Sequence, residues 1–100
     1  MQLGNTKPLR ENSMQESPNE RVSVLASFNR GPKGSVIVLP HVMRWRGKRY
    51  VLGTFGLHHP ERRGTKRIHI FSFQAGDNAF RVELDPDSLE WTLTGVDYGA

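Results

Sequence analysis

From Arg21 onward the chain consists of short runs in which hydrophobic and polar residues alternate. Every second residue from Val22 to Phe28 is apolar, which places these side chains on one face of an extended strand. Residues that favour turns, mainly Gly, Pro, Asn and Asp, separate one run from the next. The pattern predicts six strands, at residues 21–29, 35–45, 48–57, 66–75, 78–85 and 89–96. It predicts turns or loops at 30–34, 46–47, 58–65, 76–78 and 85–88.

No segment has an apolar period of 3.6 residues over three turns, so no helix is expected. Six short strands with regular turns are typical of an antiparallel meander, and the fold class is all-β. Such a sheet buries one face by curling into a small, partly open barrel or by splitting into a sandwich.

Two runs are irregular. Pro40 interrupts residues 35–45 and predicts a bulge or an edge position, because proline donates no ladder hydrogen bond. In residues 66–75 the apolar positions change parity between Ile70 and Phe71. A bulge near Ile70 explains the change, and so does burial on both faces.

Residues 1–20 are polar and have no apolar period, which predicts a disordered tail ahead of a single domain at 21–98. Met1 and Met14 are both candidate start residues. The 100 residues leave room for one domain with a modest core.

Composition removes several function classes. The chain has no cysteine, which excludes disulfides, thiolate metal sites and cysteine nucleophiles. No stretch reaches the roughly 18 apolar residues of a membrane span, and we expect a cytoplasmic protein that does not bind membranes. No catalytic or cofactor motif is present, so we expect no enzyme, no cofactor and no metal. His58 and His59, with His41 or His69, are the nearest approach to a metal site, but adjacent residues in an extended chain point apart.

Charge is distributed unevenly along the chain. Residues 21–74 contain eleven Lys and Arg and one acid, Glu61, whereas residues 75–100 contain six acids and one basic residue, Arg81. Such asymmetry indicates a surface for a polyanion. Internal pairing, in which the acidic late strands neutralise the basic early ones, explains the pattern equally well.

Two basic clusters are candidate nucleic-acid-binding sites. The first surrounds the turn at 46–47 and includes the aromatic residues Trp45 and Tyr50, which we assign to the core rather than to base stacking. The second lies around residues 58–65, and turns alternate between the two ends of a meander. Arg30 and Lys33 are therefore expected near the second cluster, with Asp85 and Asp87 close by. The predicted contacts are Arg44, Arg46, Lys48, Arg49, Arg62, Arg63 and Lys66.

Residues 40–51 read Pro-His-Val-Met-Arg-Trp-Arg-Gly-Lys-Arg-Tyr-Val, and residues 89–93 read Leu-Glu-Trp-Thr-Leu. This combination resembles a family of short, uncharacterised bacterial proteins with a Trp-Arg-Gly-Lys/Arg-Arg-Tyr hairpin and a closing strand built around a tryptophan. Members are often encoded near genes for error-prone DNA polymerases. The resemblance, over residues 36–97, implies a DNA-related setting without a known activity or site.

The sequence therefore predicts a small β module that binds DNA or RNA through backbone phosphates. The alternative is a protein-interaction module that docks an acidic partner or adds a strand at its sheet edge.

Overall fold

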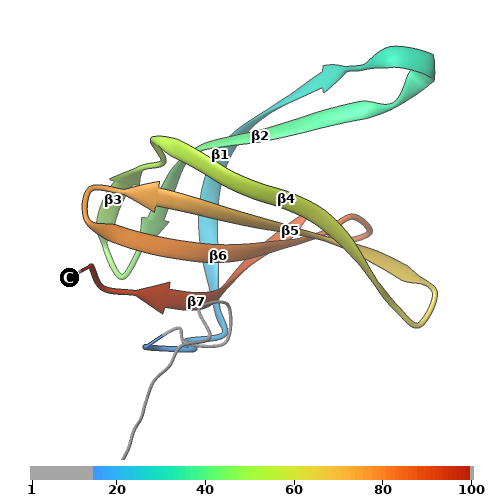
Figure 1. Ribbon diagram of the computed structural model, residues 1–100. Coiled ribbons are helices and arrows are strands. Elements are labelled where there is room, and N and C mark those ends of the chain that lie inside the picture. The colour runs from blue at the N-terminus through green and yellow to red at the C-terminus, as the bar shows by residue number, and fades with distance from the viewer. Residues whose placement is uncertain (1–14, 100) are drawn as a thin grey trace, which may run out of the picture.

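The computed structural model describes residues 15–99, with backbone only at 54–57. Seven antiparallel strands form one sheet in the order β3-β2-β1-β7-β6-β5-β4 (Figure 1). A short 3-10 turn, η3 (Pro32–Gly34), separates the first two strands. No helix in this range has the length and apolar character needed to cross a membrane. The strands are β1 (Glu20–Arg30), β2 (Val36–Trp45), β3 (Lys48–Val51), β4 (Thr54–Arg63), β5 (Lys66–Ala75), β6 (Asn78–Asp85) and β7 (Glu90–Asp97).

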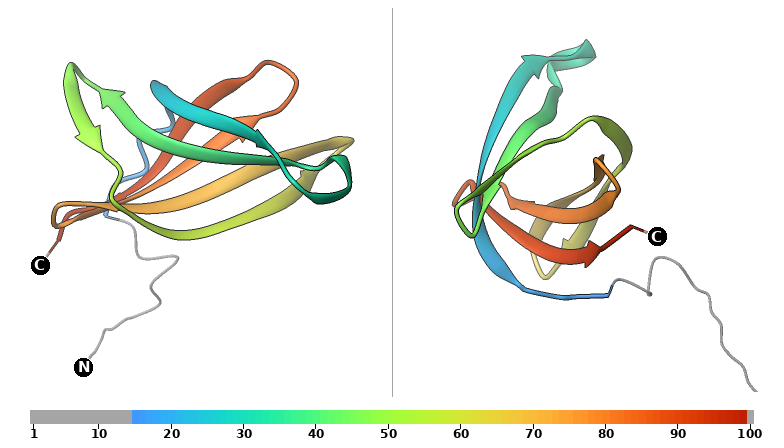
Figure 2. Two further views of the ribbon diagram at one scale, coloured as in Figure 1. Left: turned by 90° about the horizontal axis from the view of Figure 1, so that it is seen from above. Right: turned by 90° about the vertical axis from the view of Figure 1, so that its left-hand side faces the viewer.

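The sheet curls around its inner face but does not close (Figure 2). Its two edge strands, β3 and β4, are joined by two residues that bond to different parts of the sheet. Leu52 N–H donates to the carbonyl of His41 on β2 at 2.9 Å, and Gly53 N–H donates to the carbonyl of Gln74 on β5 at 3.0 Å. The prediction of an all-β, curled antiparallel sheet is confirmed.

The strand count differs from the prediction. The run at 48–57 divides at Leu52 and Gly53, and residues 58–63, expected in a loop, belong to β4. Pro60 in this segment favoured the loop assignment. Because β4 is an edge strand, Pro60 can pair with His69 of β5 while its missing N–H leaves no neighbour unbonded.

The core lies on the inner face of the curled sheet and is rich in aromatic residues. Phe80 is fully buried, and its ring lies 6.4 Å from that of Trp45 and 5.0 Å from that of Tyr50. Phe71, also fully buried, lies 5.6 Å from the ring of Trp91. The assignment of Trp45 to the core is therefore confirmed.

β5 is buried on both faces, which accounts for its change of parity. Its register with β6 runs without a shift from His69 to Ala75, so no bulge is present there. Phe71 and Phe73 face the core, while Ile68 and Ile70 are 7% and 4% exposed on the opposite face.

The predicted tail is shorter than expected at its C-terminal end. Residues 1–14 lie outside the described range. Glu16, however, pairs with Val96 through two backbone hydrogen bonds of 3.0 and 2.9 Å, and Glu20 begins β1. The polar composition of this segment predicted disorder, but its carboxylates are bound by side chains of the folded domain. Tyr98 donates a hydrogen bond to Glu16, and Trp45 donates one to Glu20.

The turns alternate between the two ends of the sheet, as predicted. Those at 30–35, 64–65 and 86–89 lie at one end, and those at 46–47 and 76–77 lie at the other (Figure 2). At the first end the outer part of the β1–β2 hairpin projects away from the rest of the molecule, while Val24, Ala26 and Val38 nearer its base pack with the core. We call its residues 23–41 the β1–β2 arm (Figure 1).

Candidate nucleic-acid interface

The fold places a net positive charge in one half of the sheet. Residues 21–53, which contain β1 after its first residue, β2 and β3, include seven Lys and Arg and no Asp or Glu. The half formed by β4–β7 contains five Lys and Arg and seven acids between residues 54 and 97. A polyanion would therefore be attracted to the β1–β3 half.

Arg44 and Arg49 lie directly opposite each other on the outer face of β2 and β3. Both are exposed, and neither forms an ion pair with any carboxylate in residues 15–99. Like charges in directly opposed positions destabilise a sheet unless an anion lies between them. They line a groove of about 360 Å³ together with Ser23, Val24, Leu25 and Val42.

Lys48 lies at the start of β3, next to this pair in the chain. Its Nζ atom is 5.6 Å from the centre of the Tyr50 ring, a cation–π contact that leaves the ammonium exposed. With Arg49, it also lines a shallow groove of about 450 Å³ that extends to Asp77 and Asn78. Lys48 thus places a cation near the turn at 46–47 on the Tyr50 side of β3, opposite to the face that holds Arg49.

Arg46, the fourth member of the first cluster, is held by the protein itself. Its Nη2 and Nε atoms donate to the two carboxylate oxygens of Glu20 at 2.7 and 3.2 Å, and its guanidinium lies 4.6 Å from the centre of the Trp45 ring. Trp45 Nε1–H donates to the same carboxylate at 2.8 Å. The hydrogen bonds from Arg46, and then from Trp45, lower the pKa of Glu20.

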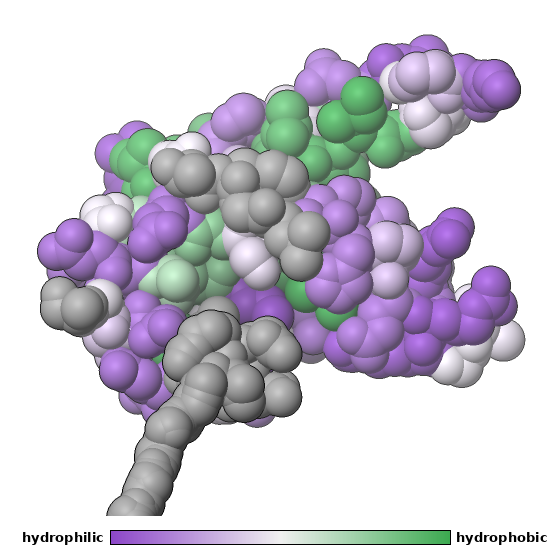
Figure 3. Space-filling model, in the orientation of Figure 1, coloured by the Kyte–Doolittle hydropathy of each residue, from purple (hydrophilic) through white to green (hydrophobic). Residues whose placement is uncertain are grey.

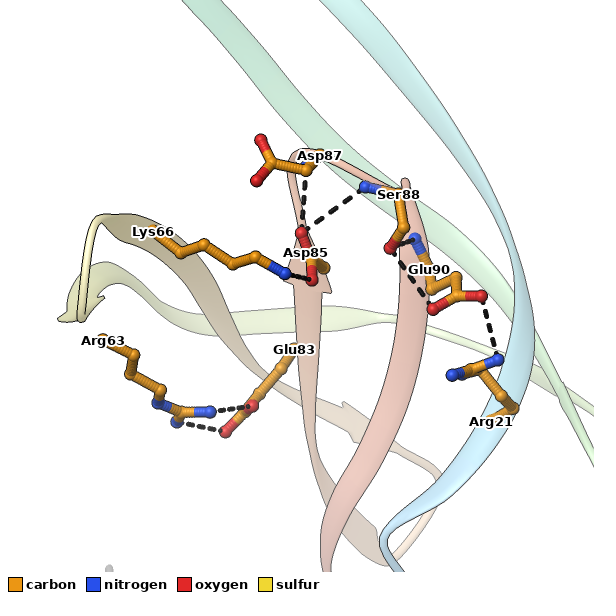
Figure 4. A network of polar contacts seen from close by, with 8 residues as sticks. All are labelled: Arg21, Arg63, Lys66, Glu83, Asp85, Asp87, Ser88 and Glu90. Carbon is orange, nitrogen blue, oxygen red and sulfur yellow. Dashed lines mark hydrogen bonds and ion pairs between the residues drawn. The ribbon is translucent and has the colours of Figure 1, made fainter.

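In the second cluster, Arg63 and Lys66 are also paired internally (Figure 4). Arg63 donates two hydrogen bonds of 2.8 Å to Glu83 and one of 3.1 Å to Glu61, which further raises its pKa. Lys66 donates to Asp85 at 2.7 Å, and this bond lowers the pKa of Asp85. For these two residues the structure has the internal pairing that the charge pattern left open.

A polar groove of about 530 Å³ lies beside the Arg63 network on the outer face of β4–β7. Two arginines, Arg63 and Arg81, and two glutamates, Glu61 and Glu83, contribute to its lining. Because these charges balance, the groove does not favour a polyanion. Its floor is Ile70, so the network also covers the apolar outer side of β5.

Arg62 lies apart from this network. It faces Arg67 across β4 and β5, next to the turn at 64–65, and both side chains are exposed. The expected convergence with Arg30 and Lys33 is not seen, because the β1–β2 arm carries these two residues away from the β4–β5 turn (Figure 1). Turn alternation fixes which end of a sheet a residue reaches, but the length and curvature of a hairpin decide its distance from other turns.

The histidines do not assemble into a metal site. His58 and His69 form a hydrogen bond of 3.1 Å, and the His58 ring stacks on Phe71 at 4.4 Å. His59 lines the polar groove on the other face, and His41 bonds to Ser27 at 2.8 Å. No group of three or more His, Asp or Glu side chains within the described range is arranged to hold a metal ion. His58 is in a strand rather than in the predicted loop.

The His58–His69 pair gives an expected pH dependence of stability. Burial lowers the pKa of both rings. The nearby charges of His69 and His59 add to the effect at His58, and that of Arg67 adds to it at His69. Because the unfolded chain then binds protons more readily, stability should decrease as the pH falls through the ordinary value of 6.5.

Urea unfolding at pH 7.5 and 5.5 tests this expectation, since acidic groups with lowered pKa titrate below that window. His69→Gln should flatten the dependence, whereas the control His41→Gln should retain it. If the stability of His69→Gln depended on pH as that of the wild type does, the His58–His69 pair would not be the cause.

A scan against protein-family models and searches of curated proteins and of solved structures found no match to this chain. The resemblance of residues 36–97 to the bacterial hairpin family therefore stays a prediction. The interpretation of the site depends on its own chemistry.

Proposed function

We propose that the protein is a non-enzymatic module that binds nucleic acid through backbone phosphates, using the outer face of β2 and β3. One observation carries this proposal: Arg44 and Arg49 oppose each other, exposed and without a carboxylate partner, in a half of the sheet with no acid between residues 21 and 53. A cytoplasmic location, where DNA and RNA are available, is part of the proposal.

The proposed mechanism is electrostatic. Directly opposed residues of an antiparallel pair have Cα atoms about 4.5–5.5 Å apart, so Arg44 and Arg49 can present two guanidinium groups to one stretch of phosphates. Each phosphate contact releases condensed counterions, which makes the affinity strongly dependent on salt. Such contacts carry no base information, so little sequence preference is expected.

The seven cations predicted from sequence do not contribute equally to this proposal. Arg44 and Arg49 are the principal contacts because they are exposed on the same face, and Lys48 is a secondary one because its side chain lies on the Tyr50 side of β3. The residues already bound to carboxylates, Arg46, Arg63 and Lys66, would have to exchange one anion for another. Arg62 lies on the β4–β5 hairpin, away from this face, so replacing it tests whether the position of a cation affects binding.

Binding to labelled single- and double-stranded oligonucleotides, followed by fluorescence anisotropy at several salt concentrations, tests the proposal. In the Arg44→Gln, Arg49→Gln double variant, the slope of log affinity against log salt should fall by about two units. The affinity at low salt should fall at least ~10-fold, equally for unrelated sequences.

The matched control is the Arg62→Gln, Arg67→Gln variant. It removes the same charge from another directly opposed pair and should bind nearly as well as the wild type. Equal losses of affinity in the two variants would show that binding depends on net charge and not on the outer face of β2 and β3. Wild-type protein that does not bind at about 50 mM salt would overturn the proposal. Binding to polyglutamate but not to oligonucleotides would instead favour an acidic protein partner.

A further inference from the structure

The β1–β2 arm has free edges on both sides. β1 bonds to β7 only from Glu20 to Val22, and β2 bonds to β3 only from Val42 onward. Between these points, the two strands of the arm have no other strand partner within residues 15–99. The arm is therefore a two-stranded ribbon. Its base packs with the core through Val24, Ala26 and Val38, but its outer part has no such support, and an isolated ribbon is at best marginally stable in water.

Hydrophobic side chains cover the arm, and its tip is hydrophilic (Figure 3). The arm contributes five of the eight large hydrophobic residues that are exposed in the described part of the chain. Because Phe28 pairs with Val38 while Leu39 pairs with Ser27, the exposed residues belong to both faces of the ribbon. They are Leu25 (67% exposed), Phe28 (54%), Val36 (62%), Ile37 (45%) and Leu39 (37%). Apolar exposure on this scale marks an interaction surface.

Only one long edge of the sheet lacks the features that usually prevent edge pairing. The β4 edge has Pro60 followed by three charged residues, and the β2 edge has Pro40 beside a bulge. β3 is only four residues long and begins with two basic residues. The free edge of β1 over residues 23–29 contains neither proline nor charge.

The charge of the arm indicates what pairs with this edge. Residues 22–29 and 34–43 contain no Lys, Arg, Asp or Glu, so a nucleic acid or an acidic protein would gain no ionic contact along the ribbon. A neutral ribbon of the same pattern is the complementary surface, and each copy of the chain has one. We propose that two copies pair antiparallel along β1, with Ser27 at the two-fold axis.

This register is self-complementary. Ala26 of one copy faces Phe28 of the other on the inner side, and Leu25 faces Asn29 on the outer side. Arg30 of one copy lies opposite Val24 of the other, so the two Arg30 residues are six positions apart along the paired strands. That separation is about 20 Å, well beyond the screening length of ~8 Å in physiological salt, so the two cations do not oppose pairing.

A two-fold axis perpendicular to the sheet keeps both outer faces on the same side. The two Arg44–Arg49 pairs would then belong to one continuous surface. Pairing itself does not depend on the proposed function, because it is measured without any oligonucleotide.

Sedimentation equilibrium of the wild type and of the Leu25→Lys, Phe28→Lys variant tests the proposal. Both side chains are exposed, so the variant should keep the monomer fold, which circular dichroism checks. We expect a wild-type dimer whose dissociation constant rises at least ~30-fold in the variant. Leu89→Lys, at an equally exposed position outside the arm, is the control and should dimerise like the wild type.

The absence of cysteine allows a second measurement that leaves the apolar side chains of the arm unchanged. Ser27→Cys places two thiols at the proposed axis, within the Cα separation of about 4.4–6.8 Å that a disulfide spans. Mild oxidation should cross-link this variant rapidly and should leave Thr65→Cys, at the exposed β4–β5 turn, largely monomeric. A monomeric wild type, a lysine variant that dimerises normally, or equal cross-linking of both cysteine variants would overturn the proposal.

Discussion

Replacing Phe80 with alanine should lower the free energy of unfolding by about 3–5 kcal/mol. Its ring is fully buried between Trp45 and Tyr50, so truncation leaves a cavity under β2 and β3. Small domains have about 5–15 kcal/mol of total stability, so this single change removes a large share of it. Urea unfolding followed by tryptophan fluorescence measures the loss.

Phe28→Ala is the matched control, because it removes the same side chain from a position that is 54% exposed on the arm. Measured at a concentration where the protein is monomeric, its midpoint should stay close to that of the wild type. If the two variants lost similar stability, Phe28 would be packed against other residues in solution, and the description of the arm as exposed would be wrong.

Glu20→Ala should have a smaller but clear effect, lowering the thermal midpoint by more than loss of an isolated surface ion pair. The carboxylate accepts the hydrogen bond that the buried Trp45 indole N–H donates, and it also binds Arg46. An unpaired buried donor is costly, whereas exposed ion pairs contribute little. The difference from the wild type should be complete above the ordinary carboxyl pKa of 4.5 and should shrink as the pH falls below it, because the pKa of Glu20 is lowered in the folded protein.

Glu20→Gln separates these two contributions. An amide oxygen can still accept from Trp45 without its former charge toward Arg46, so this variant should recover much of the stability. Glu90→Ala, which removes the exposed partner of Arg21 on β7, serves as the surface ion-pair control. The expected order of thermal midpoints is Glu90→Ala highest, then Glu20→Gln, then Glu20→Ala.

The fold could be predicted where alternation was clean and local. β6 and β7 follow their period-two patterns closely because one face is buried and the other faces solvent. Residues 58–63 of β4 were missed because their charges and Pro60 are typical of a loop, and only their position at the sheet edge makes them compatible with a strand. The division of residues 48–57 at Gly53 depends on bonds to His41 and Gln74. Their partners lie on separate strands, so no local pattern shows them.

The same contrast applies to the candidate site. A two-residue turn at Arg46 and Gly47 places Arg44 opposite Arg49, so this pair was accessible from the sequence. The pairing of Arg63 with Glu83 was not, because it spans β4, β5 and β6 and depends on the register of two separate hairpins. The exposed arm was also missed. Alternation shows which residues share a face, but it does not show whether anything packs against that face.

The bonding of β1 to β7 has a consequence for biosynthesis. The first strand meets the last through pairs such as Glu20–Leu93, about 70 residues apart in the chain. During translation β1 and β2 leave the ribosome one after the other and can form their hairpin early, whereas β7 is the last of the seven strands to be made. Throughout that interval β1 is bonded on one side alone, along its whole length rather than only within the arm. Neighbouring ribosomes on one messenger would therefore carry such half-bonded edges until β7 is made, which makes nascent polysomes the setting where pairing between copies competes most directly with folding.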